Sequence, residues 1–359
     1  MKVAILGSGA IGGIAGIYMS LNGEDVTFID NNKEHVVAMR EKGIIVDGCR
    51  GHFELPPQKA FTPDELTEPL EAVFLATKIQ HTESAVNGIK HLLKDDSFVV
   101  SLQNGFNEEL IASIIGENRT IGALPDYGGA YLEPGHFEYV HEGPAYVGEL
   151  DHSITPRIKE LQRLLSFNTK CNIANDIYAR TWAKAIYGSQ VVASSLVDEP
   201  IYHVLSEEIT KRVSGSCVRE LLQLALKLNV NVPGGDFFEP ELYLPKTKED
   251  TEKLFVLMDR ALEKLSKHQE HDEEEKIGYN YVKKSSGIHW DLVYRKRETE
   301  IGTRNKYLQM KSKEANMEIP LNTKLFSMIF EIEQGKRTMG WANMKEMNAY
   351  IEEMGAMLP

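Results

Sequence analysis

The chain has 359 residues and a formal net charge of −13, with a sequence pI of about 5.4. Its length suits two domains rather than one core, and its acidity argues against a nucleic-acid partner, because such proteins gather Lys and Arg on one surface. Three widely spaced cysteines indicate a reducing compartment, so we expect a cytoplasmic protein.

The first residues follow the pattern of a dinucleotide-binding turn. An apolar strand over residues 3–6 is followed by a small-residue helix, and between them stand Gly7, Ser8, Gly9, Ala10, Ile11 and Gly12. Gly7 permits the tight turn, Gly9 lets the backbone approach a pyrophosphate, and Gly12 lets the helix pack closely. The apolar run could suggest a signal peptide or a membrane span, but its glycines would weaken a lone helix by about 1 kcal/mol each, so we expect neither.

The second predicted strand, residues 24–30, ends in a carboxylate. Asp30 lies about 20 residues beyond the glycines, where the ribose hydroxyls of the cofactor are recognised. Its carboxylate would repel a 2′-phosphate, which favours NADH over NADPH. Two alternatives stay open: Asp30 caps the helix that starts near Lys33, or residues 31–33 accommodate a phosphate.

Strands and helices then alternate, and the order predicts a parallel sheet. We expect helices at 33–42 and 158–165, a hairpin of 44–46 with 52–55, strands at 72–77, 97–102, 120–124, 137–141, 145–148 and 170–173, and turns at the glycines 128, 129, 135 and 143. Lys78 and Asn104 follow two of these strands directly. Ligands of such sheets lie beyond the carboxyl ends of the strands, so both side chains are candidates for contact with the cofactor.

The predicted fold class is α/β, with an N-terminal Rossmann-type, doubly wound sheet in residues 1–175 and a C-terminal all-helical domain in residues 176–359. A long amphipathic helix is predicted from apolar residues at every fourth position: Leu205, Ile209, Val213, Cys217 and Leu221. His268 and His271 stand beside acidic residues in the segment 232–284, but no second ligand pair follows, so we predict no metal site.

Reduction of a ketone by a nicotinamide cofactor needs a group that stabilises the developing oxyanion and donates a proton. Lysine can do both, and Trp182-Ala183-Lys184 lies on the first predicted helix of the second domain. Over about residues 1–333 the chain resembles the ketopantoate reductase (2-dehydropantoate 2-reductase) family, through the glycine turn, Lys78, Asn104-Gly105, Trp182-Ala183-Lys184, Thr299-Glu300-Ile301 with Asn305, and Ile319-Pro320-Leu321-Asn322.

This resemblance implies a role for each matching residue. Lys184 would be the proton donor, and Glu300 would orient it and bind a substrate hydroxyl. Lys78 and Asn104 would contact the cofactor and the substrate. The family reduces 2-dehydropantoate to pantoate with NADPH, on the way to pantothenate.

The substrate region also differs from the family. Ser285 and Ser286 resemble the serine that holds the substrate carboxylate. At the fourth and eighth positions after the family lysine, however, the usual asparagines are replaced by Gly188 and Val192. A site that loses two amides should discriminate poorly for a hydroxylated substrate and better for a less polar one. The methionine-rich tail is interpreted as packing or subunit contact.

The leading hypothesis is an NAD(P)H-dependent oxidoreductase that reduces the ketone of a small 2-oxo acid, with 2-dehydropantoate as the family's default. The alternative is an NADH-linked 2-hydroxyacid dehydrogenase of the same family with a less polar substrate. A third hypothesis is a regulator that senses NAD(P)H without catalysis, in which Lys184 would be inert. No membrane partner is expected, and the sequence leaves a homodimer open.

Overall fold

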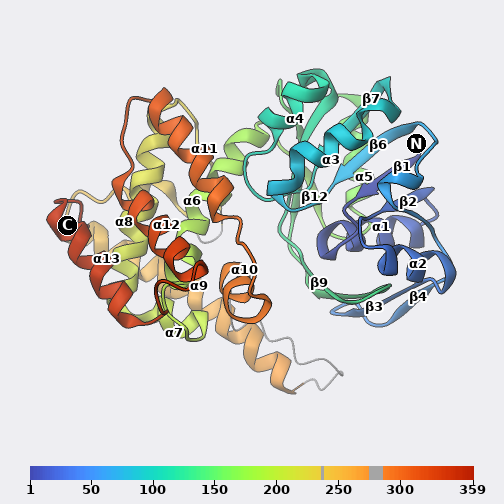
Figure 1. Ribbon diagram of the computed structural model, residues 1–359. Helices are drawn as coiled ribbons and strands as arrows, with labels where there is room; N and C mark the ends of the chain where they lie inside the picture. Colours follow the sequence, from blue (N-terminus) through green and yellow to red (C-terminus); the bar gives the residue numbers. More distant parts are fainter. Residues whose placement is uncertain (236–237, 275–285) are drawn as a thin grey trace. The chain divides into compact units, whose positions relative to one another are not determined.

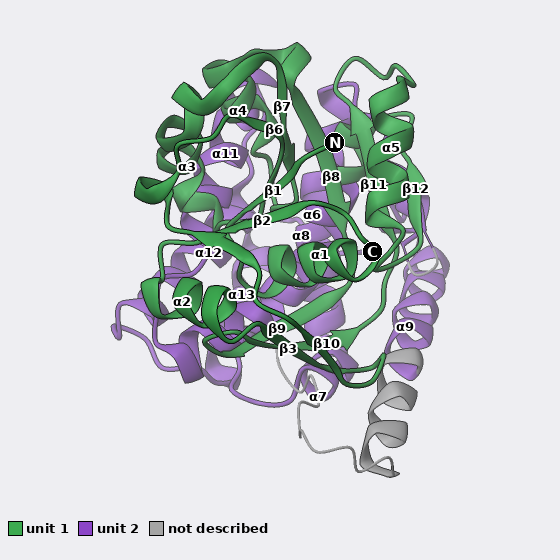
Figure 2. Cartoon of the chain, turned by 90° about the vertical axis from the view of Figure 1, so that its right-hand side faces the viewer, with its two compact units in different colours: residues 1–181 green, residues 182–359 purple. Residues whose placement is uncertain are grey.

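The computed structural model describes residues 1–235, 238–274 and 286–359. The chain divides into two compact units, Met1–Thr181 and Trp182–Pro359, which Figure 2 draws in different colours. The division falls inside helix α6 (Ile177–Ser194), a few residues after the domain boundary that the sequence suggests.

Unit 1 is built on an eight-stranded sheet with the order β12-β11-β8-β7-β6-β1-β2-β5, in a part of the chain that is described throughout. The strands are β1 (Val3–Leu6), β2 (Val26–Ile29), β5 (Lys59–Phe61), β6 (Leu70–Leu75), β7 (Leu93–Ser101), β8 (Thr120–Pro125), β11 (Ala145–Glu149) and β12 (Cys171–Ile173). In the part of the sheet with the order β8-β7-β6-β1-β2-β5, every pair of neighbouring strands is parallel. Strand β11 runs antiparallel to β8. The short edge strand β5 was not predicted.

Helices cover both faces of this sheet. Alternate side chains of a strand point to opposite faces, so each central strand contributes to two apolar cores. In β1, Val3 and Ile5 belong to one apolar core and Ala4 and Leu6 to another. The first core includes residues of α1 (Ala10–Leu21), α2 (Lys33–Glu41) and α5 (Pro156–Leu165), and the second includes residues of α3 (Thr82–Ile89) and α4 (Glu108–Ile115) (Figure 1). The predicted doubly wound α/β fold is confirmed.

A second, four-stranded sheet of unit 1 has the order β4-β3-β10-β9. It contains the predicted hairpin and consists of β3 (Ile44–Gly48), β4 (Phe53–Leu55), β9 (Gly128–Glu133) and β10 (His136–His141). The turn expected at Gly128 and Gly129 was wrong, because both residues lie in β9. A Cβ at Gly129 would come within 2.8 Å of the carbonyl oxygen of Ala10, so the glycine permits close packing of the strand against α1.

Unit 2 is helical, as predicted. Beyond the residues of α6 that it contains, its helices are α7 (Ile201–Ser206), α8 (Glu208–Lys227), α9 (Lys248–Glu274), α10 (Gly287–Trp290), α11 (Ile301–Glu314), α12 (Pro320–Glu333) and α13 (Trp341–Glu353). The amphipathic helix expected from Leu205 onward is broken: Leu205 belongs to α7, and Glu207 has an extended backbone (φ −71, ψ 135) that starts α8. Val213, Cys217 and Leu221 of α8 are buried as expected.

The family-like segment that ends in Asn322 forms the start of α12. The buried carboxylate of Glu220 accepts hydrogen bonds from the backbone N–H groups of Leu321 (2.9 Å) and Asn322 (2.8 Å). The Asn322 amide also donates to the carbonyl oxygen of Cys217 at 2.9 Å. A carboxylate at a helix N-terminus satisfies N–H groups that have no partner within the helix, so this motif joins α12 to α8.

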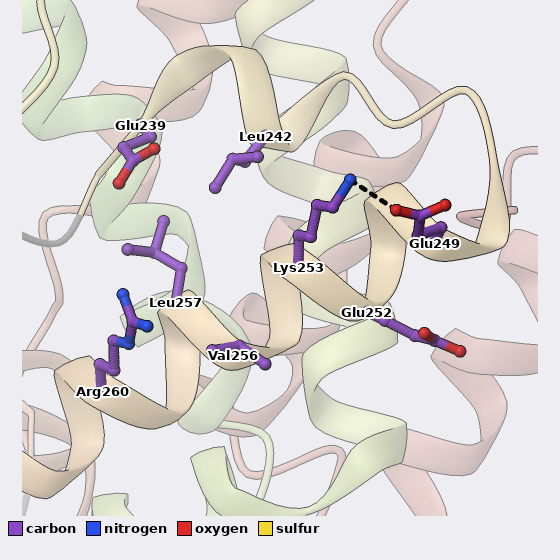
Figure 3. A pocket seen from close by; sticks show the side chains of 8 residues that line it. All are labelled: Glu239, Leu242, Glu249, Glu252, Lys253, Val256, Leu257 and Arg260. Atoms are coloured by element: carbon purple, nitrogen blue, oxygen red, sulfur yellow. Dashed lines mark ion pairs between the residues drawn. The ribbon is translucent and has the colours of Figure 1, made fainter.

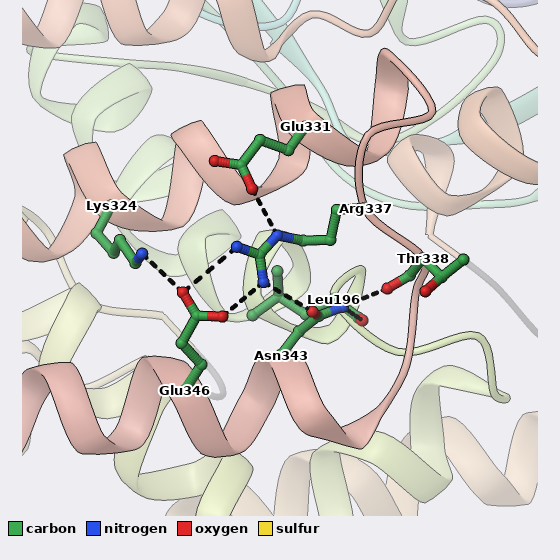
Figure 4. Close-up of polar contacts among 7 residues, drawn as sticks. All are labelled: Leu196, Lys324, Glu331, Arg337, Thr338, Asn343 and Glu346. Carbon is green, nitrogen blue, oxygen red and sulfur yellow. Dashed lines mark hydrogen bonds and ion pairs between the residues drawn. The ribbon is translucent and has the colours of Figure 1, made fainter.

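A polar network attaches the C-terminal helix α13 to the rest of unit 2 (Figure 4). Arg337 contacts Glu331 and Glu346, each at 2.7 Å, and Lys324 contacts Glu346 at 2.7 Å. The Asn343 amide donates to the carbonyl oxygen of Leu196, which follows α6, at 3.0 Å. Among the tail methionines, Met344 and Met347 are fully buried, so this part of the tail packs into the unit as interpreted.

We expect Glu346→Gln to lower stability in a pH-dependent way. Hydrogen bonds from Arg337, then Lys324, lower the pKa of Glu346 from 4.5 to about 2. A depressed carboxyl pKa stabilises the fold above about pH 4.5 and loses that effect as the pH falls toward 2. Because the side chain is 41% exposed, screening limits the contribution to about 1 kcal/mol. In thermal melts, the melting temperature of the variant should fall less between pH 7 and pH 3 than that of the parent. Glu353→Gln on the same helix should melt like the parent at each pH.

Candidate active site

The glycine turn lies at the carboxyl end of β1, whose two neighbours are β2 and β6. The chain leaves β1 toward β2 on one side and reaches β6 on the other, so this is a point where the strand order reverses, and ligands of such sheets bind there. Gly7 has a φ of 92°, and a Cβ there would lie 2.7 Å from the backbone nitrogen of Thr77. A Cβ at Gly12 would lie 2.4 Å from the Gly7 carbonyl oxygen. Both glycines are therefore required by backbone packing.

Gly9 differs from these two glycines, because a Cβ there would meet no protein atom within 4 Å. Gly9 is also the N-cap residue of helix α1, and its carbonyl oxygen accepts from the backbone nitrogen of Gly13 at 2.7 Å. The N–H groups of residues 10–12 have no carbonyl partner within a helix that begins here, and no side chain caps this end. Open space over uncapped N–H groups fits the pyrophosphate of a dinucleotide.

Ser8 faces the interior. Its hydroxyl accepts from the backbone N–H of Ile29 at 3.0 Å and is 3.2 Å from the Ile29 carbonyl oxygen. The Ser8 carbonyl oxygen accepts from Nε2 of His35 at 2.9 Å, while the backbone N–H of Gly135 donates to Nδ1 at 3.0 Å. These two contacts fit a ring that carries a proton on Nε2 and fixes the turn, and burial lowers the pKa of His35. A lone histidine in an amphipathic helix gave no sequence signal for this role.

Asp30 follows β2 at the same edge of the sheet. Its Oδ1 accepts from the backbone N–H of Asn32 at 2.9 Å, and the side chain of Asn32 caps α2 by accepting from the His35 backbone N–H at 3.2 Å. Asn32 is thus the residue that caps α2. The half-buried Tyr131 receives a hydrogen bond from Asn32 at 3.5 Å, and its pKa is raised by burial, then by the charges of Asp30 and Glu34. The end of β2 is therefore an acidic environment.

Lys78 and Asn104 lie just after β6 and β7, at the edge that carries the glycine turn. Lys78 is half-buried, and Asn104 is exposed. Buried amides hold the two loops: Gln103 donates to the Thr77 carbonyl oxygen at 2.8 Å, and Asn107 donates to the Asn104 carbonyl oxygen at 2.9 Å. The structure thus brings the residues predicted to bind cofactor in unit 1 to one edge of one sheet.

Glu108, the first residue of α4, is a further polar residue near this edge that gives no functional signal in the sequence. Its side chain accepts from the backbone N–H of Asn107 at 3.1 Å, and the residue is buried. Burial raises the pKa of this carboxyl from 4.5 to about 7. A buried carboxyl therefore contacts the backbone of the loop that carries Asn104.

The predicted catalytic residues belong to unit 2. Lys184 is half-buried on α6, and Glu300 is the residue before the first turn of α11. Four residues later, the backbone N–H of Arg304 donates to the Glu300 carbonyl oxygen at 3.1 Å. The Arg304 guanidinium donates to the carbonyl oxygen of Ala185 and to Oγ of Ser189. Arg304 thus links the start of α11 to α6 one residue beyond Lys184.

Ser285 lies outside the described residues, so only Ser286 of the predicted serine pair can be placed. Ser286 is buried, and its Oγ accepts from the backbone N–H of His289 at 3.0 Å and lies 2.9 Å from Oγ of Ser195. The Nε2 of His289 is 2.8 Å from Oδ1 of Asp198. The Ser286 hydroxyl is therefore engaged in capping α10, and its contact with a substrate stays a prediction.

Figure 3 shows a pocket of unit 2 between η5 (Pro240–Tyr243) and α9, with a volume of about 530 Å³. It is lined by Glu239, Leu242, Glu249, Glu252, Lys253, Val256, Leu257 and Arg260, none of them a predicted site residue. Among the residues that the structure describes, no three His, Cys, Asp or Glu side chains cluster as metal ligands. His268 and His271 fall outside the described side chains. Within the described ranges, no helix has both the length and the apolar character needed to cross a membrane.

Comparison with known proteins agrees with this geometry. Residues 3–152 match the family model of ketopantoate reductase PanE/ApbA. Those residues belong to the ketopantoate reductase family. The resemblance seen in the sequence is thus confirmed for the part of unit 1 that carries the glycine turn, Asp30, Lys78 and Asn104.

Relatives extend the comparison. A 2-dehydropantoate 2-reductase of Archaeoglobus fulgidus is 30% identical over 192 residues, which are 53% of this chain and 62% of that protein. The chain therefore spans less than two thirds of the length of this ketopantoate reductase.

Solved structures share the fold over nearly the whole chain. D-mandelate dehydrogenase with NADH and anilino(oxo)acetate aligns with a TM-score of 0.76 at 18% identity, covering 93% of this chain and 99% of that chain. The 2-dehydropantoate 2-reductase of Geobacter metallireducens GS-15 aligns with a TM-score of 0.72 at 21% identity, covering 92% and 99%. The chain therefore shares the fold of these dehydrogenase and reductase structures.

Proposed function

We propose that this chain is an NAD(P)H-dependent oxidoreductase that reduces the ketone of a small 2-oxo acid, with 2-dehydropantoate as the first substrate to test. One observation carries the proposal: open space over Gly9 at the uncapped start of α1, within a stretch of the ketopantoate reductase family. The positions of Lys184 and Glu300 in unit 2 extend the proposal from cofactor binding to the reduction itself.

A bound nicotinamide would supply the hydride. Gly9 and the N–H groups after it would hold the pyrophosphate, and Asp30 would accept from the ribose hydroxyls. The residues of unit 1 would thus bind and orient the cofactor. In unit 2, the Lys184 ammonium would stabilise the negative charge that develops on the ketone oxygen and then donate a proton to it. Glu300 would orient the lysine and bind a hydroxyl of the substrate.

The proposal is tested by a two-by-two assay of cofactor against 2-oxo acid. NADH and NADPH are each combined with 2-dehydropantoate and with a branched or aromatic 2-oxo acid, and kcat/KM is measured for the four pairs. Turnover of 2-dehydropantoate far above the other acid supports the pantoate reaction. No turnover of any 2-oxo acid with either cofactor would reject the reductase.

A second candidate is an NADH-linked 2-hydroxyacid dehydrogenase with a less polar substrate. It is favoured by Gly188 and by Val192, which is buried, at the positions where the family has asparagines. The D-mandelate dehydrogenase structure that shares this fold holds NADH. Equal or better turnover of the apolar 2-oxo acid in the same assay would select this candidate.

We expect Asp30→Ala to reduce the preference for NADH. The parent should bind NADH more tightly than NADPH, because the acidic end of β2 repels a 2′-phosphate and Asp30 accepts from the ribose hydroxyls. The variant should lose about tenfold in the ratio of the two Kd values, or about 1.4 kcal/mol. Fluorescence titration measures both constants, with Asp25→Ala as the control, because Asp25 is an exposed residue just before β2. A parent that prefers NADPH would refute this role of Asp30.

Compartment and assembly remain expectations of the proposed enzyme. Cys49, Cys171 and Cys217 are all free thiols, which supports a reducing compartment such as the cytoplasm. The homodimer that the sequence leaves open is tested by light scattering on the purified protein.

A further inference from the structure

Arg304 occupies the space beside Gly188, where the family has an asparagine. Lys184 and Gly188 are four residues apart on α6, so they lie on the same face of the helix, one turn apart. A Cβ at Gly188 would be 3.6 Å from Nη1 of Arg304. The guanidinium therefore lies next to the position of the missing amide, on the helix face that carries Lys184.

The guanidinium is held firmly in this place. One of its nitrogens, Nη2, donates to the carbonyl oxygen of Ala185 and, at 2.9 Å, to Oγ of Ser189. Its carbon Cζ is 5.8 Å from the centre of the Phe326 ring. Burial lowers the pKa of Arg304 to about 10, and the charge of Glu300 opposes this shift. The group remains a cation at neutral pH and is fixed by contacts within unit 2.

These contacts do not use all the N–H donors of Arg304. Among the described residues, its Nε has no hydrogen-bond partner although it is buried, and a guanidinium carries five N–H donors. Leaving a buried charged donor unsatisfied is costly. A planar guanidinium matches the two oxygens of a carboxylate.

We propose that Arg304 binds the carboxylate of the 2-oxo acid and replaces the amide that the family places at position 188. This inference rests on the proposed function and narrows its substrate class. Gly188 and Val192 offer no polar side-chain atom to a substrate hydroxyl, so recognition depends on the acid group. The favoured substrate class is a 2-oxo monoacid with an apolar remainder.

The test compares a 2-oxo acid with its methyl ester, which keeps the ketone and lacks the charge. In the parent, kcat/KM should favour the acid. In Arg304→Gln, KM for the acid should rise roughly 10- to 100-fold, as expected for loss of a hydrogen bond to a charged group, while kcat/KM for the ester stays nearly constant. Turnover of the ester also reports that the variant is folded. Guanidinium ion added to Arg304→Ala should restore part of the acid activity. The control Arg212→Gln, which changes a half-buried arginine of α8 that pairs with Glu208, should behave like the parent.

An unchanged ratio of acid to ester turnover in Arg304→Gln would overturn the inference and leave Arg304 as a residue that only joins α11 to α6. Such a residue would lower the melting temperature without changing the acid-to-ester ratio. If the parent reduces neither compound with NADH or NADPH, the proposed function itself fails, and this inference fails with it. The two failures are thus separate results.

Discussion

Lys184→Ala is expected to lower kcat by ~10²–10⁴-fold, the usual contribution of a positioned proton donor, which corresponds to roughly 3–5 kcal/mol in the barrier. Alanine removes the ammonium that would stabilise the oxyanion and protonate it. The Kd for NADH should remain nearly unchanged, because the residues that would hold the cofactor, Gly9 and Asp30, belong to unit 1 and Lys184 belongs to unit 2. Steady-state kinetics and fluorescence titration of NADH measure the two effects on the same protein.

Two further variants sharpen this result. Lys184→Met keeps most of the side-chain volume and removes the charge, so it should be as inactive as alanine if the charge matters. Lys253→Ala removes a lysine of α9 that is 57% exposed and pairs with Glu249 at 2.9 Å, and it should have parental kinetics. Unchanged kcat in both Lys184 variants would reject the proton-donor role. A parent that binds NADH tightly but reduces no 2-oxo acid would instead favour the regulator.

The sequence was most informative where local pattern and tertiary environment coincide. Strands buried on both faces appear as continuous apolar runs, so residues 72–77 and 97–102 were located correctly as β6 and β7. The short edge strand Lys59–Phe61 has too few residues for a pattern. Gly128 and Gly129 resemble turn residues, and only the packing of β9 against α1 explains them as strand residues.

The residues of the candidate site also fall into those that the sequence located and those that it did not. The glycine turn and Asp30 could be located because backbone chemistry fixes their spacing. His35 and Glu108 could not, since both roles depend on burial, and that of His35 also depends on Gly135, which is far away in the sequence. Arg304 was missed although it stands four residues after Glu300. Its signal was indirect: a glycine at position 188 leaves room that a long side chain from another helix can occupy.

The second large effect separates two glycines of the same turn. Gly9→Ala is expected to weaken NADH binding at least about tenfold, or about 1.4 kcal/mol, with little loss of stability. Gly9 has a φ of −75°, which alanine adopts without strain, and its Cβ would meet no protein atom within 4 Å. The methyl group would instead stand where the pyrophosphate approaches.

Gly12→Ala should instead lower the stability of the fold. Its Cβ would lie 2.4 Å from the Gly7 carbonyl oxygen and 2.8 Å from Cβ of Ala76, so α1 would have to move away from β1. Overpacking of this kind costs roughly 1–3 kcal/mol or more, which a thermal melt detects as a lower melting temperature in the absence of cofactor. Parental NADH affinity in Gly9→Ala would show that the open space over Gly9 is not the pyrophosphate site, whereas a destabilised Gly9→Ala would show that the turn cannot accept a side chain. The pair therefore distinguishes a glycine required for binding from a glycine required for folding.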